Sequence, residues 1–246
     1  MKRRLKPWVI IVFMIICLSG VVYSSYNIFI WKDNSNKNNE IKQQIDEAIV
    51  VNKSVDNEYD SYEINFNMLK EQNRDTVAYL KVNNTNIDYI VLKGNDNSYY
   101  LKHNFNKEYN VMGWIFADYR NKFDGGDKNI VIFGHNIKDG TMFGSLKNVL
   151  TKEWFNDEIN HIITLVTEES ENLYQVFSTY TIEPEDYYIT TNFNSNLEYQ
   201  KFLTAIKSRS IYNYNIDVNT SDSILTLSTC TANGTKRVAV HAKKIN

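Results

Sequence analysis

The chain has 246 residues, of which 43% are hydrophobic and 13% aromatic, a composition typical of one sizeable folded domain with extensions. Its net charge is −2, and the four basic residues before Pro7 contribute +4, which leaves −6 on the rest of the chain. No basic patch follows that cluster, so the charge argues against a nucleic-acid-binding protein. The two cysteines, Cys17 and Cys230, do not predict a disulfide, and no Cys/His cluster has zinc spacing.

An apolar segment follows the basic cluster and predicts a membrane anchor. Residues 8–23 are almost wholly apolar, and residues 28–31 extend them to the length of a transmembrane helix. We therefore assign residues 8–30 to one span and residues 1–7 to a cytoplasmic tail, with the rest of the chain outside the cell. A cleaved signal peptide is the alternative, but the segment has no good small-x-small cleavage site.

Residues 31–72 predict a polar spacer followed by two helices. Residues 33–40 are polar throughout, whereas residues 41–51 and 62–71 carry apolar side chains at helical spacing. These helices are either a plain stem or elements docked on the next domain, and their apolar stripes favour docking.

Residues 73–246 change to short runs with a period of two, and we assign them to one catalytic domain. The predicted strands are 76–82, 87–92, 111–118, 129–133, 159–166, 173–181, 224–230 and 238–242. Helices are predicted over residues 142–150 and 197–208. Many short strands separated by turns predict a mostly β fold, a closed or nearly closed barrel with peripheral helices.

Three residues with reactive or charged side chains lie at the ends of predicted strands. Cys230 ends one strand, and Arg237 opens the next after an Asn233-Gly234 turn, which predicts a hairpin. His135 follows the strand over residues 129–133. A thiol nucleophile, a proton carrier and a fixed cation are the groups that acyl transfer through a thioester requires.

Each of these residues also has a structural alternative. Cys230 could be a small buried hydrophobic residue, His135 a loop histidine bonded to backbone, and Arg237 a solvated strand residue. The remaining histidines lack a comparable strand-end setting: His103, His161 and His241.

The motifs around the three residues resemble those of class B sortases. Thr226-Leu227-Ser228-Thr229-Cys230 followed by Arg237 is similar to the sortase signature, TLxTC and then Arg. Further segments that resemble the class are Phe133-Gly134-His135-Asn136, Gly140-Thr141-Met142-Phe143, Asp96-Asn97-Ser98-Tyr99-Tyr100-Leu101 and Asp118-Tyr119-Arg120-Asn121. The resemblance covers roughly residues 73–245, and several motifs in the right order make it specific.

The resemblance implies an eight-stranded barrel and a membrane-anchored cysteine transpeptidase of Gram-positive bacteria. By this resemblance, Cys230 attacks the bond after Thr in a C-terminal sorting signal of NPxTx or [SP]PxTG type. An amine of a peptidoglycan precursor then resolves the thioester. His135 is implied as general acid and base, and Arg237 as the group that holds the substrate or the oxyanion. The implied partners are surface proteins with a sorting signal, and no cofactor or metal is implied.

The resemblance also implies substrate contacts, because residues 182–193 correspond to the family's substrate-recognition loop. The candidate contacts are Ser228, Thr229, Tyr187, Tyr188, Thr191 and Asn192. The loop from Cys230 to Arg237 is short for class B, and Ala232 lies where some relatives carry an acid, so no carboxylate partner is assigned.

Two other functions remain open on the sequence alone. A cysteine endopeptidase could use the same nucleophile and base with water as the acceptor. A non-catalytic peptide-binding module could pack Cys230 as an ordinary apolar side chain.

Overall fold

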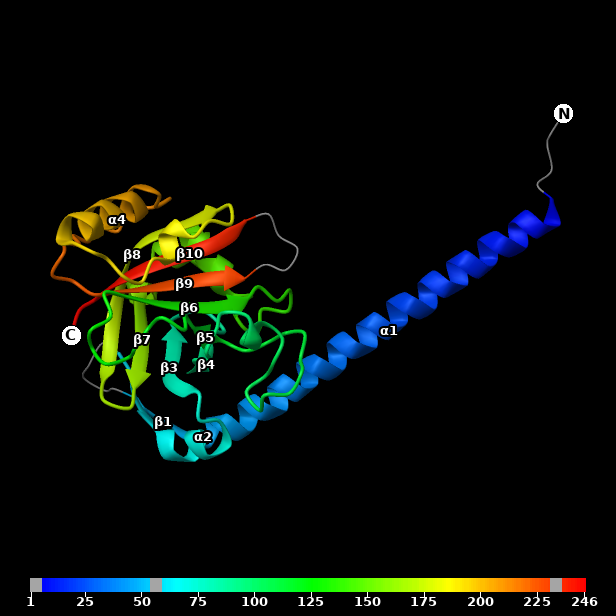
Figure 1. The fold of residues 1–246 in the computed structure, drawn as a ribbon, viewed down its shortest axis with the longest axis horizontal. Helices are drawn as coiled ribbons and strands as arrows, with labels where there is room; N and C mark the ends of the chain where they lie inside the picture. The colour runs from blue at the N-terminus through cyan, green and yellow to red at the C-terminus, as the bar shows by residue number, and fades with distance from the viewer. Residues whose placement is uncertain (1–5, 54–58, 231–235) are drawn as a thin grey trace.

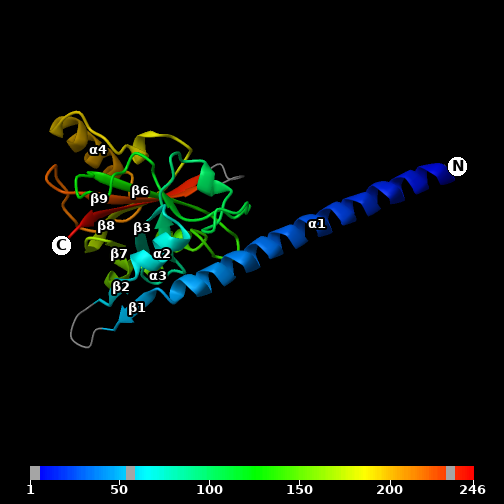
Figure 2. The same ribbon diagram turned by 60° about the horizontal axis from the view of Figure 1, so that its bottom comes forward.

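The computed structural model describes residues 6–53, 59–230 and 236–246. Its body is a closed eight-stranded barrel, and a long N-terminal helix projects from it (Figures 1 and 2). The strands follow the order β10-β8-β7-β3-β4-β5-β6-β9 around the barrel. The predicted mostly β barrel with N-terminal and peripheral helices is confirmed.

The strands are β1 Ile49–Asn52, β2 Ser61–Ile64, β3 Thr76–Val82, β4 Asp88–Leu92, β5 Phe116–Ala117, β6 Asn129–His135, β7 Ile162–Thr167, β8 Glu171–Ile182, β9 Ile224–Cys230 and β10 Arg237–Lys244. The α-helices are α1 Pro7–Asp46, α2 Phe66–Gln72, α3 Lys152–Phe155 and α4 Asn196–Ser208. The 3-10 helices within the described residues are η1 Tyr99–Leu101, η2 Leu146–Leu150, η3 Glu158–His161 and η4 Tyr187–Ile189.

The hydrophobic core fills the barrel, because the strands are rich in β-branched and aromatic residues that pack well on a pleated surface. Fully buried examples from three different strands are Leu80, Ile90 and Leu227. A second cluster lies between β8 and α4, where Phe177 meets Phe202 and Leu203. Ser195 caps α4 by accepting a hydrogen bond from the Glu198 N–H at 3.2 Å. The predicted helix over 197–208 is thereby confirmed.

Helix α1 continues far beyond the predicted span. It has 40 residues, and its apolar part is exposed and is long and apolar enough to cross a membrane. The spacer predicted over residues 33–40 is wrong, because this stretch is helical and buries Asn34 and Asn38. Ile41 and Ile45 are buried on the last turns, so the end of α1 docks on the domain, as the apolar stripe predicted.

Two other helix predictions near α1 need correction. The predicted helix over 41–51 ends at Asp46, and β1 follows it and pairs with β2 through Ile49 and Ile64. The predicted helix over 62–71 starts only at Phe66, where Asn65 accepts a hydrogen bond from the Met68 N–H at 3.1 Å. β-branched and aromatic residues in both stretches favour the hairpin over helix ends.

Three predicted elements in the barrel are shorter than expected. The strand over 111–118 is reduced to β5 because Gly113 has φ +59°, and a Cβ there would lie 2.3 Å from the Tyr100 carbonyl oxygen. The predicted helix over 142–150 is only η2, and the predicted strand over 159–166 begins with η3. The Asn233-Gly234 turn and most of the basic tail lie outside the described residues.

Candidate active site

The ends of β6, β9 and β10 bring the predicted catalytic positions together. β6 and β9 run parallel, and the last pair in their register is His135 opposite Cys230. β9 and β10 run antiparallel, with Ser228 opposite Ala239. Ser228 lies two residues before Cys230, and Ala239 lies two residues after Arg237. Figure 1 shows the arrows of β6 and β9 ending at the same side of the barrel. The predicted hairpin and the predicted strand-end meeting are therefore present.

A buried polar group of β9 fixes this strand in place. The Thr226 hydroxyl lies 2.8 Å from the Asn129 amide oxygen and 2.8 Å from His241 Nδ1, with all three groups buried. The opposite nitrogen of His241, Nε2, lies 2.8 Å from the Tyr180 hydroxyl. His241 is thus a structural histidine, and burial lowers its pKa to about 3, with the Arg209 charge as a smaller cause.

His135 is half-buried at the exit of β6. Its Nε2 lies 2.7 Å from the Leu101 carbonyl oxygen, and a carbonyl only accepts, so Nε2 donates in this contact. In neutral histidine this tautomer leaves Nδ1 as an acceptor. Gly134 packs the preceding position tightly, because a Cβ there would lie 2.5 Å from Ile115 Cδ1 and 2.7 Å from Phe143 Cγ. The imidazole is therefore held by both a hydrogen bond and the backbone beneath it.

Arg237 presents a buried donor at the start of β10. Its Nε is buried and has no hydrogen-bond partner in the part of the chain that the structure describes. Buried polar groups without a partner are rare in folded proteins, and a catalytic role is one of the reasons for which they are kept. The Arg237 guanidinium lines the same cavity as His135. It can donate to a substrate carbonyl or to an oxyanion.

A cavity of about 460 Å³ opens at this end of the barrel. Its walls combine apolar side chains with a few polar groups: Asn97, Leu101, Lys102, Tyr109, Val111, Phe116, Phe133, His135, Asp186, Ile189 and Arg237. Apolar walls with a few convergent polar groups are typical of sites that bind a small ligand or a peptide side chain.

Three of the predicted substrate contacts are engaged inside the fold. Tyr188 and Ser228 are both fully buried, and their hydroxyls lie 2.8 Å apart. The buried Thr229 hydroxyl accepts a hydrogen bond from the Val238 N–H at 2.9 Å. None of these residues belongs to the cavity wall.

The other three predicted contacts flank the cavity without lining it. Tyr187 is exposed and its ring lies 5.6 Å from that of Phe202, while Asn192 is exposed and donates to the buried Thr191. The same segment instead contributes Asp186 and Ile189 to the wall. The burial of the Tyr188 side chain determines which way the neighbouring side chains of this segment face. The sequence alone does not reveal this orientation.

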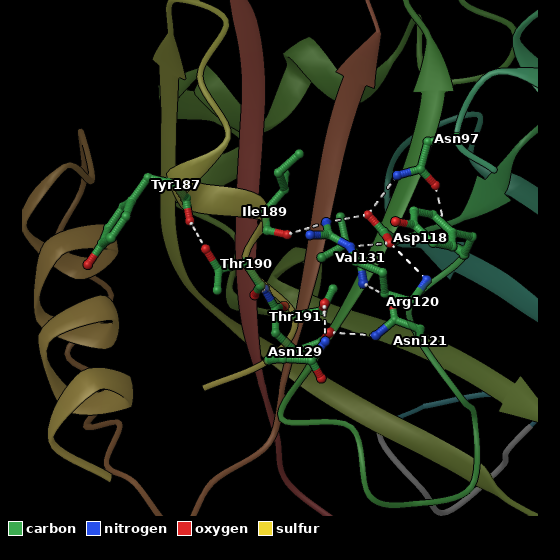
Figure 3. Close-up of polar contacts among 12 residues, drawn as sticks. Asn97, Asp118, Arg120, Asn121, Asn129, Val131, Tyr187, Ile189, Thr190 and Thr191 are labelled. Atoms are coloured by element: carbon green, nitrogen blue, oxygen red, sulfur yellow. Dashed lines mark hydrogen bonds and ion pairs between the residues drawn. The ribbon is translucent and has the colours of Figure 1, made fainter. Parts of the chain in front are cut away.

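A polar network behind the wall is a structural element that the sequence did not predict. Figure 3 shows Asp118 between Arg120 and Asn97. Arg120 donates from Nε and Nη2 to the two carboxylate oxygens at 2.8 and 2.7 Å, and Asn97 donates to Oδ2 at 2.8 Å. Arg120 Nη2 also donates to the Ile189 carbonyl at 3.1 Å. The Asn129 side chain donates a hydrogen bond at 2.9 Å to the carbonyl of Thr190, the residue after Ile189. These bonds tie the η4 wall of the cavity to the barrel.

Asp118 is ionised in this network. Burial raises its pKa, but hydrogen bonds from Arg120 and Asn97 outweigh burial and hold the pKa below the usual aspartate range. The resemblance singled out Asp118-Tyr119-Arg120-Asn121 only as a motif. In this motif the acid Asp118 and the guanidinium of Arg120 are two positions apart, directly after β5. This pattern is the signal that predicts an internal ion pair.

Comparison with known proteins decides the family. A family model described as a sortase domain matches residues 80–245. The chain belongs to the sortase family. Sortase B of Listeria monocytogenes is 38% identical over 164 residues, which span 66% of this chain and 65% of that protein. The class B resemblance of the motifs is thereby confirmed.

Solved sortase B structures match the fold as well. Bacillus anthracis sortase B aligns with a TM-score of 0.75 and 32% identity, over 87% of this chain and 98% of that one. A Staphylococcus aureus sortase B–substrate complex aligns with a TM-score of 0.69 and 35% identity, over 74% and 84%. Sortase B enzymes are cell-wall sorting transpeptidases, so the family supplies the class of reaction. In the described residues of this sortase, no group of His, Cys, Asp and Glu could hold a metal ion.

Proposed function

We propose that this sortase is a cysteine transpeptidase that joins a surface protein to a peptidoglycan amine. It cleaves a C-terminal sorting signal of NPxTx or [SP]PxTG type after the Thr. The observation that carries the proposal is the β6–β9 register, which pairs His135 with Cys230 beside a cavity lined by Arg237. A nucleophile position, a base and a fixed cation at one cavity are what thioester acyl transfer needs.

In the first half-reaction the Cys230 thiolate forms a bond to the Thr carbonyl carbon, and the carbonyl electrons move to oxygen. The Arg237 guanidinium donates to this oxyanion or to a nearby substrate carbonyl. The oxyanion then re-forms the carbonyl, the C–N bond breaks, and protonated His135 gives its proton to the leaving amine. The product is a thioester on Cys230.

In the second half-reaction the acceptor amine attacks the thioester carbonyl, and His135 takes the proton that the amine loses. The C–S bond breaks, the new amide forms, and Cys230 returns as thiolate. The net change exchanges one amide for another, with no oxidant, metal or cofactor in the balance.

We propose that α1 anchors the enzyme, with residues 8–30 in the cytoplasmic membrane, residues 1–7 inside the cell and the barrel outside. The exposed apolar half of α1 supports this assignment, because an exposed helix of that composition is unstable in water. The N-terminal basic cluster supports the orientation.

For substrate recognition we propose the exposed residues Tyr187 and Asn192, which belong to the same segment as Ile189 of the cavity wall. We propose that Tyr188, Thr191, Ser228 and Thr229 act from behind the surface by fixing its shape. Their burial supports this division.

The test uses the soluble part from Asp33 onward, incubated with peptides that carry NPxTx, SPxTG or LPxTG signals. Each reaction runs with and without oligoglycine or a diaminopimelate-type amine, and mass spectrometry identifies the products. We expect an amine-linked product with one signal class that disappears in Cys230→Ala and His135→Ala. Arg237→Ala should reduce turnover strongly, whereas Lys236→Ala, which removes an adjacent exposed cation, should not.

Other outcomes separate the alternatives. Cleavage with water in the presence of every amine would favour an endopeptidase. A Cys230→Ala variant with wild-type turnover would rule out both enzymes and leave a peptide-binding module.

A further inference from the structure

Helix α1 docks on the domain immediately after its apolar part ends. Asn34 accepts a hydrogen bond from the Val111 N–H at 3.2 Å, and Asn38 donates to the Gly113 carbonyl at 3.2 Å. Fully buried Asn110 donates to the Asn34 carbonyl at 3.0 Å and to the Asn38 amide oxygen at 2.9 Å. These hydrogen bonds hold α1 against residues 110–113.

This dock fixes the height of the domain relative to the apolar segment. Asn34 follows Trp31, the last residue of that segment, by three positions, which is about 4.5 Å along a helix. The polar headgroup layer on each side of a bilayer is about 5–7 Å thick. As the chain runs from Gly113 back to Val111, its contacts move from Asn38 to Asn34, toward the apolar segment. Asn110 and Val111 therefore lie beside Asn34, within the depth of the headgroup layer, and Tyr109 directly precedes them.

The loop at this level exposes aromatic side chains. Tyr109 is 67% exposed, and Tyr99 and Val111 are also exposed. The Tyr99 ring stacks on His103 at 3.9 Å, and Tyr109 meets the edge of His103 at 6.2 Å. Trp31 on α1 is exposed at the same level. Tyrosine and tryptophan favour the membrane–water interface, because their rings are apolar and their polar groups remain hydrated.

The same loop forms one wall of the active-site cavity. Tyr109 and Val111 line it together with His135 and Arg237. In Figure 1 the arrows of β6 and β9 point toward the side on which the N-terminal half of α1 extends. The catalytic end of the barrel therefore faces the membrane side of the molecule, not the side of α4.

We propose that the loop of residues 99–111, here called the aromatic loop, rests in the headgroup layer of the outer leaflet, and that the active-site cavity opens at the bilayer surface. The inference rests on the proposed anchor. The partner is a lipid surface, and the enzyme takes peptides that are presented close to it.

The aromatic loop has a small net charge. Lys107 pairs with Asp75 at 2.9 Å, and Glu108 lies in the same turn. On α1, Lys37 pairs with Asp33 at 2.9 Å. Lys102 adds one exposed positive charge, so aromatic burial drives the contact and anionic lipid adds only a small attraction.

The test places a fluorophore in the full-length chain. A Cys17→Ala/Cys230→Ala background receives Tyr109→Cys or, as a matched control, Leu197→Cys, which is an exposed position on α4. Both variants are labelled with an environment-sensitive dye and reconstituted in phosphatidylcholine vesicles. We expect a blue-shifted emission at position 109 that headgroup spin-labelled lipid quenches several-fold more than at position 197. Adding anionic lipid should increase this difference only slightly.

A second variant moves the loop away from the bilayer. Seven helix-forming residues inserted between Trp31 and Lys32 add nearly two turns and raise the domain by about 10.5 Å while keeping its facing direction. The label at position 109 should then emit as in water. Equal quenching at positions 109 and 197, or no effect of the insertion, would overturn the inference while leaving the transpeptidase proposal intact. Release of the chain by carbonate would overturn the anchor and the aromatic-loop contact together.

Discussion

Replacing Asp118 with alanine removes the acceptor at the centre of the network behind the cavity wall. The Asp118 side chain is 0% exposed and accepts from Arg120 twice and from Asn97 once. The substitution leaves the Arg120 guanidinium without its carboxylate partner. Breaking a buried pair from one side costs about 3–5 kcal/mol. The Arg120 side chain is 36% exposed and can be rehydrated, so we expect about 3 kcal/mol, the lower end of that range.

Urea unfolding of the soluble part measures this loss as a change in midpoint at constant slope. For a domain of this size, 3 kcal/mol corresponds to a fall in Tm of about 6–12 °C. The matched control is Asp217→Ala, which breaks an ion pair with Lys207 that is fully exposed on the aspartate side and should change stability little. The double variant Asp118→Ala/Arg120→Ala should lose less than the sum of the single variants, because the two residues act as a unit.

The pH dependence gives an independent check. The folded-state pKa of Asp118 lies below the ordinary aspartate value, so its contribution is present above that value and is lost as the pH falls through the folded-state pKa. The stability difference between wild type and Asp118→Ala should therefore shrink in acid. The peptide KM should rise more than kcat falls, because Arg120 holds the Ile189 wall and does not touch the reacting bond. A loss no larger than that of Asp217→Ala, or strict additivity in the double variant, would refute the reasoning.

Three further predictions follow from the packing around the site. His241 has a folded-state pKa of about 3 and an ordinary value of 6.5, so wild-type stability should fall below pH 6.5 by up to about 1.4 kcal/mol per pH unit, and urea midpoints of His241→Gln should show a shallower decline. An unchanged slope would contradict the burial argument. Gly134→Ala places a methyl group in a filled space and should cost about 1–3 kcal/mol in thermal unfolding and reduce turnover through His135, whereas in the control Gly94→Ala the added Cβ meets nothing closer than 3.5 Å and should cost little. Tyr188→Phe should cost about 1–3 kcal/mol in thermal unfolding, because the buried Ser228 hydroxyl loses this partner, while the double variant Tyr188→Phe/Ser228→Ala should be closer to wild type. A raised peptide KM without a stability loss would instead make these two residues direct substrate contacts.

The strand ends that carry His135 and Cys230 could be predicted because they are local in sequence. The β9 run ends at Cys230, the β6 run ends at His135, and both runs consist of apolar and β-branched residues that favour strands. The barrel class follows from many such runs separated by turns. The parallel pairing that brings the two ends together joins distant segments, and neither the spacing nor the family resemblance specified it.

The parts that the sequence did not predict depend on distant partners. Asn34 and Asn38 continue the buried face of Ile41 and Ile45. The sequence suggested a polar spacer instead, because asparagine is typical of spacers and the partner Asn110 lies over seventy positions away. The inward turn of Tyr188 is set by a hydroxyl on β9 in the same way. Residue type alone cannot distinguish a buried, fully bonded polar side chain from an exposed contact.

The β6–β9 seam also has a consequence for the order in which the enzyme folds. Asn129 pairs with Ile224, 95 positions later, which is a larger separation than in the β3–β7 pairing of Ala78 with Thr167. Pairings between segments so far apart require the closure of a long loop, so they form slowly. The predicted nucleophile, Cys230, lies on one strand of the seam and the predicted base, His135, on the other. The two residues therefore come together only when this slow pairing has formed.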